Sequence, residues 1–214
     1  MKNKSVVVFV IVAVCALFIA LGIAYKQVSS SVSENRRGDL PPYVRDYSLK
    51  MGENSKNVVV VEFIDPQCIA CAEFYPVVKK VFYNYEKEIQ LVIRYLPIHK
   101  YAANAVQILE AARKQGKFNE MLEALFQSQA IWGDSKNNNP NLIWNYVVQV
   151  EGIDMELLKK DLNDEVVMQH LQMDEDDAKT LGVTGTPTLF VNGKPLETLS
   201  YKALSELIES EIYK

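Results

Sequence analysis

Cys68 and Cys71, two cysteines separated by two residues, are the side chains best suited to covalent chemistry in this sequence. An apolar, β-branched run from Val58 to Ile64 precedes them and is typical of a buried strand, and Asp65-Pro66 then signals a turn. Apolar residues at helical spacing follow from Ala72 to Phe82. We therefore expect Cys68 at or just before the first turn of a helix. Because free amides and the dipole of a helix N-terminus favour the thiolate, the pattern predicts a reversible dithiol/disulfide site.

Two other uses of a cysteine pair fit this sequence less well. A structural zinc ion needs four ligands, but there is no second cysteine pair, and His99 and His170 are far apart and not in metal-ligand spacing. A structural disulfide that closes so short a loop would constrain little of the unfolded chain. We therefore expect redox chemistry at Cys68 and Cys71, with no metal and no other cofactor.

The composition indicates one globular domain with a hydrophobic appendage. The chain has 214 residues, of which 49% are hydrophobic and 23% charged, and its formal net charge is −4. A nucleic-acid-binding protein would normally carry a basic field, so this charge argues against one. The third cysteine, Cys15, falls in an apolar segment, so the remainder holds only the Cys68–Cys71 pair and no structural disulfide framework.

The N-terminal segment predicts export. After Lys2 and Lys4 the chain runs from Val6 to Ala24 without a charged residue, and at ~1.5 Å per residue such a helix approaches the ~30 Å hydrocarbon core of a bilayer. We expect residues 1–25 to form an uncleaved signal anchor and transmembrane helix. The alternative is a signal peptide cleaved after Gly22-Ile23-Ala24, which would release the rest of the chain as a soluble protein.

The remainder divides into a Ser-rich tether with an N-terminal edge (26–56), a βαβ half (57–98), a helical block (99–181) and a ββα half (182–214). An edge strand or turn can fall within 43–56. Further expected strands are 89–96, 188–191 and 195–198, the last two joined by a tight Asn192-Gly193 turn. Further expected helices cover 102–114, 118–129, 142–150, 155–162, 165–181 and 201–213.

Two motifs far apart in the chain resemble the thioredoxin superfamily. They are the stretch from Phe63 to Cys71 and the stretch from Gly182 to Thr188, which contains Thr186-Pro187. The helical block between them, together with Arg94-Tyr95-Leu96-Pro97-Ile98, looks like the DsbA-like branch of thiol–disulfide oxidoreductases. The likeness covers residues 57–214. It implies an α/β class with a thioredoxin-like fold and an inserted helical domain, which the N-terminal transmembrane helix would precede.

The resemblance also implies roles for individual residues. The Thr186–Pro187 bond would be cis and would lie against the cysteines, and the Thr186 backbone would pair with an extended substrate peptide. Glu62 would act as general base for Cys71, with Arg94 on the neighbouring strand as its partner. An edge position for Glu62, in water and without such a role, is the alternative reading.

The function that follows is a membrane-tethered oxidoreductase that oxidises cysteine pairs in exported proteins through Cys68 and Cys71. Expected partners are those substrates and a membrane or extracytoplasmic redox partner, and the chain is expected to be a monomer. It would sit in a bacterial cell membrane by a single pass, with its catalytic domain on the periplasmic side. The alternatives are a disulfide reductase or isomerase, or a peptide-binding chaperone with an inert disulfide.

The dipeptide Ile69-Ala70 departs from well-known family members because it holds neither His nor Pro. The helix dipole alone lowers a thiol pKa by about one unit, which predicts a moderate oxidant. Among the other polar residues, we expect His99 at a helix start or on the surface, His170 in solvent, and Asp174 to Asp177 on a solvated helix face.

Overall fold

The computed structural model describes residues 13–24, 39–134, 136 and 139–214. Residues 13–24 are helical with exposed side chains, and residues 1–12 and 25 of the expected signal anchor lie outside the described residues. None of the helices in the described part of the chain combines the length and the hydropathy needed to cross a membrane.

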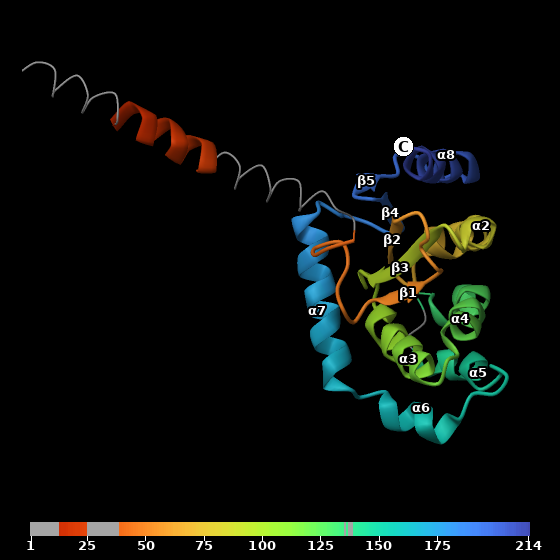
Figure 1. The fold of residues 1–214 in the computed structure, drawn as a ribbon. Helices are drawn as coiled ribbons and strands as arrows, with labels where there is room; N and C mark the ends of the chain where they lie inside the picture. Colours follow the sequence, from red (N-terminus) through yellow and green to blue (C-terminus); the bar gives the residue numbers. More distant parts are fainter. Residues whose placement is uncertain (1–12, 25–38, 135, 137–138) are drawn as a thin grey trace, which may run out of the picture.

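A five-stranded sheet in the order β1-β3-β2-β4-β5 forms the centre of the fold (Figure 1). β2 and β3 are parallel, which makes them and the helix between them a βαβ unit, and the other pairings are antiparallel. The strands are β1 (Leu49–Met51), β2 (Val58–Ile64), β3 (Ile89–Tyr95), β4 (Thr188–Val191) and β5 (Lys194–Pro195).

The helices fall into two groups. α2 (Ile69–Tyr85) and α8 (Tyr201–Ile212) contact each other beside the sheet, whereas the elements between β3 and β4 form a helical insertion (Figure 1). The insertion consists of α3 (Ala102–Lys114), α4 (Phe118–Trp132), a 3-10 turn (Pro140–Ile143), α5 (Trp144–Val147), α6 (Met155–Asp161) and α7 (Glu165–Thr180).

Alternation along β2 divides the core between the two faces of the sheet. Val58, Val60 and Ile64 join a larger core that includes both cysteines and residues of α2, α3, α4 and α8. Val59, Val61 and Phe63 join a smaller core with residues of the segment before β1 and with Ala178 of α7. Because successive side chains of a strand point to opposite faces, the parity of a position on β2 or β3 decides which core it enters.

The expected order of strands and helices is confirmed, with two local differences. The predicted helix 142–150 is a 3-10 turn followed by the short α5, and the predicted strand 195–198 is confined to Lys194–Pro195. After Pro195 only the Leu196 amide still pairs with β4, and the chain then turns towards Ser200, the N-cap of α8. The hairpin turn itself has positive φ at Asn192 (47°) and Gly193 (79°), as a tight turn of this kind requires.

Candidate active site

Cys68 lies at the N-cap of α2, the position that the sequence predicts. Its backbone is extended (φ −78°, ψ 122°), and its carbonyl accepts the first helical hydrogen bond from Ala72 at 3.2 Å. Cys68 is 8% exposed and Cys71, one turn later, is 1% exposed. Both are free thiols, so the structure holds the dithiol form. The site therefore has one sulfur at the edge of the fold and one beneath it.

The surroundings of Cys68 lower its pKa to about 5. A hydrogen bond from the Cys71 thiol contributes most, burial opposes it, and the Thr186 side chain and the amides of Cys71 and Ala70 lower the pKa further. The expectation of about one unit from the helix dipole alone is therefore too small. Three kinds of donor converge on this sulfur: a thiol, a hydroxyl and two backbone amides.

The pKa of Cys71 shifts in the opposite direction. Its hydrogen bond to Cys68 and its burial both raise its pKa, and the nearby carboxyl of Glu62 raises it further. In the dithiol form, Cys71 therefore keeps its proton while Cys68 carries the negative charge. The two sulfurs are electronically distinct, which suits a site in which one sulfur meets the substrate and the other resolves the intermediate.

The loop before β4 forms the wall opposite the cysteines. The Thr186–Pro187 peptide bond is cis, as the resemblance implied, and the Cys68 sulfur lies 3.2 Å from the Thr186 carbonyl oxygen. The Thr186 hydroxyl is buried and has no hydrogen-bond partner of ordinary geometry among the described residues. The structure thus brings the Thr186 carbonyl against the Cys68 sulfur, with Pro187 as the next residue.

Glu62 points from β2 to the same face of the sheet as the cysteines. It is 4% exposed, and burial raises the pKa of its carboxyl to about 8. Among the described residues no hydrogen bond or ion pair to this carboxyl is found. It borders a cavity of about 300 Å³ that lies between β3, α2 and α4 and is lined by Tyr75, Phe82 and Phe126 among others. The edge position in open water that sequence alone allowed is wrong.

Arg94 does not pair with Glu62, contrary to expectation. In the parallel register Glu62 is opposite Ile93 and Arg94 is opposite Phe63, so the two charges project to opposite faces. Arg94 is fully buried and pairs with Asp174 and Asp177 of α7, each at 2.7 Å.

The expectation of a solvated face at Asp174 to Asp177 is therefore also wrong for these two aspartates, which are 2% and 5% exposed. A buried guanidinium needs carboxylate partners, and α7 supplies them on the face that packs against β3.

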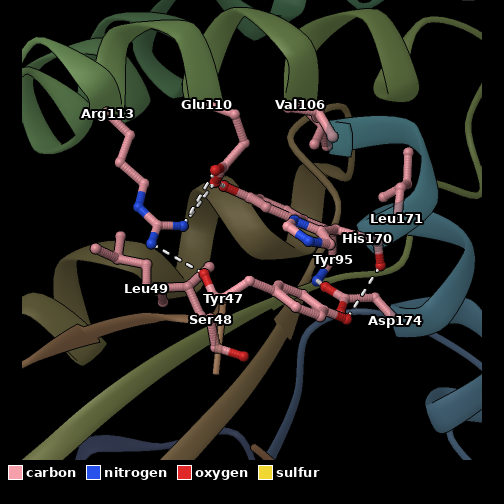
Figure 2. A pocket seen from close by; sticks show the side chains of 12 residues that line it. Tyr47, Ser48, Leu49, Tyr95, Val106, Glu110, Arg113, His170, Leu171 and Asp174 are labelled. Atoms are coloured by element: carbon pink, nitrogen blue, oxygen red, sulfur yellow. Dashed lines mark hydrogen bonds and ion pairs between the residues drawn. The ribbon is translucent and has the colours of Figure 1, made fainter. Parts of the chain in front are cut away.

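His170 is half-buried rather than solvated. Its ring stacks on that of Tyr47, with 3.8 Å between the ring centroids, beside a cavity of about 20 Å³ bounded by β1, β3, α3 and α7 (Figure 2). That volume holds about one water molecule. Neither cysteine lines this cavity, and we assign it no part in the chemistry.

Three polar residues around the cysteines carry no signal that sequence reasoning recognised. Asp65 is fully buried; its carboxylate accepts hydrogen bonds from the Gln67 and Ile98 amides and lies 2.7 Å from the His99 ring nitrogen. His99 thus lies at the surface as expected, but it is tied to the turn before Cys68. Gln67 and Gln129 are also buried there. Asp65-Pro66 indicated a turn, whereas nothing in the sequence indicated that an amide from α4 would reach it.

Comparison with known proteins gives one family. A family model described as thioredoxin matches residues 45–210. Oxidised BdbD from Bacillus subtilis is similar in structure, with a TM-score of 0.65 and 25% identity over 78% of this chain and 94% of that one. The alpha-DsbA1 of Wolbachia pipientis has a TM-score of 0.69 over 79% of this chain and 92% of that one, and at 17% identity it supports the fold alone.

The curated relatives match this chain over only a part of their own length. The Na(+)/H(+) antiporter NhaA 3 of Salinispora tropica is 32% identical over 146 residues, which make up 67% of this chain and 21% of that protein. The chain thus spans about a fifth of the length of this relative, and the antiporter name describes the longer protein.

Proposed function

The chain belongs to the thioredoxin family, and we propose that it is a DsbA-like member that catalyses thiol–disulfide exchange through Cys68 and Cys71. The position of Cys68 carries this proposal: it is the N-cap residue of α2, its sulfur lies 3.2 Å from the Thr186 carbonyl oxygen, and Cys71 follows one helical turn later. The lowered pKa of Cys68, about 5, agrees with this position. A sulfur whose thiolate is stabilised is a good leaving group, and its stabilisation in the reduced form makes the disulfide form more oxidising. The proposed direction is therefore oxidation of cysteine pairs in exported proteins.

The reaction has two exchange steps. A substrate thiolate attacks the Cys68 sulfur of the disulfide form, the Cys68–Cys71 bond breaks, and a mixed disulfide forms between Cys68 and the substrate. A second substrate thiolate attacks the substrate sulfur of that bond and expels Cys68 as a thiolate. Two electrons pass from the substrate to the cysteine pair, so a redox partner must reoxidise the pair after each turnover.

Glu62 is proposed to exchange the proton of Cys71. Cys71 leaves as a thiolate in the first step and must bind a proton, because its environment strongly favours the thiol. Glu62 lies on the same face, and its pKa of about 8 allows it to give or take a proton near neutral pH. Glu62→Gln should slow the exchange at Cys71 in stopped-flow measurements with little change in fold; unchanged kinetics would remove Glu62 from the mechanism.

Thr186 and Pro187 are proposed to bind the substrate backbone next to Cys68, and the apolar N-terminal segment is proposed to hold the domain at a bacterial membrane on its periplasmic side. Fractionation tests the second point. The full chain expressed in bacteria should remain in the membrane pellet after an alkaline carbonate wash. Recovery in the soluble periplasmic fraction would instead mean that the segment is cleaved.

Oxidation of a reduced peptide with two cysteines tests the catalytic proposal. The preoxidised protein should form the peptide disulfide, and Cys68→Ala should abolish this activity. Cys15→Ala is the matched control, because it removes a cysteine outside the site and should leave the rate unchanged. Peptide binding that survives in Cys68→Ala, with no turnover by the wild-type protein, would identify a chaperone with an inert disulfide. An equilibrium with glutathione that favours the disulfide form would indicate a reductase.

A further inference from the structure

A buried glutamine from the helical insertion holds the turn that carries Cys68. Gln129 of α4 donates both hydrogens of its side-chain amide, one to the Pro66 carbonyl and one to the Cys68 carbonyl, each at 2.9 Å. Gln129 is 5% exposed. Its amide therefore binds both ends of the peptide segment that leads into α2, the segment from residue 66 to residue 68 (the redox turn).

A second glutamine ties the same turn to the insertion from the other direction. Gln67, 4% exposed, donates its side-chain amide to the Gly133 carbonyl at 2.8 Å and accepts from the Tyr101 amide at 2.6 Å. Gly133 follows α4, and Tyr101 precedes α3. The redox turn is thus bound at its middle and at both ends by groups that belong to the insertion.

Gly133 indicates how closely these groups pack. A Cβ at this position would lie 2.7 Å from the Gln129 carbonyl oxygen and 3.2 Å from the Cγ atoms of both Gln129 and Gln67. Its backbone conformation (φ −90°, ψ −2°) is open to any residue, so glycine is required by the close approach rather than by φ. The end of α4 therefore fits against both glutamines with no room for a side chain.

We propose that Gln129 and Gln67 are positioning residues for the redox reaction: they hold the first turn of α2 so that its amides stay directed at the Cys68 sulfur. The proposal rests on the proposed thiol–disulfide function. The amides of Ala70 and Cys71 contribute to the stability of the Cys68 thiolate, and they follow directly on the peptide whose carbonyl Gln129 binds. The helical insertion thereby sets the redox properties of the site as well as covering it.

The test compares Gln129→Leu with the wild-type protein. The substitution keeps a buried side chain of similar size but removes both donors. We expect the Cys68 pKa, measured by thiolate absorbance at 240 nm against pH, to rise by about 0.5 to 1 unit, and the equilibrium constant for oxidation of glutathione to fall by about three- to tenfold. Gln127→Leu is the matched control, since Gln127 is exposed two residues earlier on α4 and its side chain donates to Glu123; it should change neither value.

Unfolding in urea separates positioning from a merely structural role. A positioning role requires that Gln129→Leu destabilise the reduced form more than the oxidised form, because only the reduced form contains the thiolate. Equal destabilisation of both forms, with an unchanged Cys68 pKa, would overturn the proposal. A wild-type protein without a low-pKa thiol would instead contradict the proposed function itself.

If Gln129→Leu does not fold, Gly133→Ala decides the question. It removes no polar group but pushes the end of α4 away from both glutamines, so the pKa should rise in the same direction by a smaller amount. An unchanged Cys68 pKa in folded Gly133→Ala would count against the proposal.

Discussion

The two faces of the central sheet differ in the partners that they give to a buried charged residue. On the face that carries α7, Arg94 is buried with all its contacts filled: Asp174 and Asp177 pair with it, and the carbonyls of Pro42 and Tyr43 accept from its remaining nitrogen. On the face that carries the cysteines, Glu62 is buried at 4% exposure, and no ion pair or hydrogen bond to it is found in the described part of the chain.

The difference separates a structural charge from one that suits chemistry. Arg94 and its aspartates fasten α7 and the segment before β1 to the sheet, and Arg45 joins them with a two-pronged bond to Asp177. A group held so firmly in its charged form has little use as a proton donor or acceptor. Glu62 has no such partner among the residues that the structure describes, so its charged form is disfavoured and its proton remains exchangeable near neutral pH.

Removing the arginine should have the largest effect on stability. Arg94→Met leaves Asp174 and Asp177 buried with too few donors, and breaking a buried ion pair from one side costs about 3–5 kcal/mol. The free energy of unfolding from urea titration measures this loss. The Cys68 pKa should not change, because Arg94 faces away from the cysteines.

An exposed ion pair on α7, the helix that carries Asp174 and Asp177, is the control for that experiment. Lys179 and Asp176 lie 3.0 Å apart with side chains 71% and 63% exposed. Lys179→Met should cost less than about 0.5 kcal/mol, as is usual for surface pairs. A loss in Arg94→Met as small as this would mean that the buried network does not fasten the two elements.

Glu62→Gln should have the next largest effect on the free energy of unfolding, and the size of this effect depends on pH. The folded protein raises the pKa of this carboxyl from 4.5 to about 8. Its neutral form therefore contributes stability that is fully present below pH 4.5 and is lost as pH rises towards 8. Relative to Glu62→Gln, the wild-type protein should lose about 3 kcal/mol between pH 4 and pH 7.

Asp177 should show the opposite pH dependence. Burial alone would raise its pKa, but hydrogen bonds from Arg45 and Arg94 outweigh burial and hold the pKa below its usual value. Its contribution is therefore present at neutral pH and lost as pH falls through the acid range. Glu156→Gln is the matched control, because it changes a carboxyl at the surface. A Glu62→Gln profile parallel to the wild-type profile would mean that Glu62 is ionised in the folded protein.

The sequence was sufficient to predict the elements but not the pairing of the charges. Apolar periodicity and turn residues placed α3 at 102–114 and β2 at 58–64, because those signals are local. Glu62 and Arg94 looked alike, each a single charge in an apolar strand, and only the register of β2 with β3 sends them to different faces.

The sequence does contain one signal for the buried aspartates. Asp174 and Asp177 are three residues apart, on one face of a helix with Leu171 and Ala178, which are buried. Two acids on an apolar helical face, together with an arginine in an apolar strand, indicate a buried network rather than a solvated surface. By contrast, Gln129 bonds to the Pro66 carbonyl 63 positions away, and no periodicity or motif predicts such a contact.

Thr186→Val should have the smallest effect on stability of these substitutions, and it tests most directly the difference between the two faces of the sheet. The Thr186 hydroxyl is a second group on the cysteine face that is buried without an ordinary partner among the described residues, and it lowers the Cys68 pKa. Valine keeps the shape and removes the donor. The oxidised form, which has no thiolate, should therefore unfold at nearly the wild-type urea concentration, while the Cys68 pKa rises by about one unit.

Urea unfolding of the two redox forms and the Cys68 pKa together distinguish a group that stabilises the fold from one that serves the reaction. A loss of stability in both redox forms would place Thr186 with Arg94, as a group whose bonds hold the structure. A change confined to the reduced form would place it with Glu62, as a polar group that serves the reaction rather than the fold.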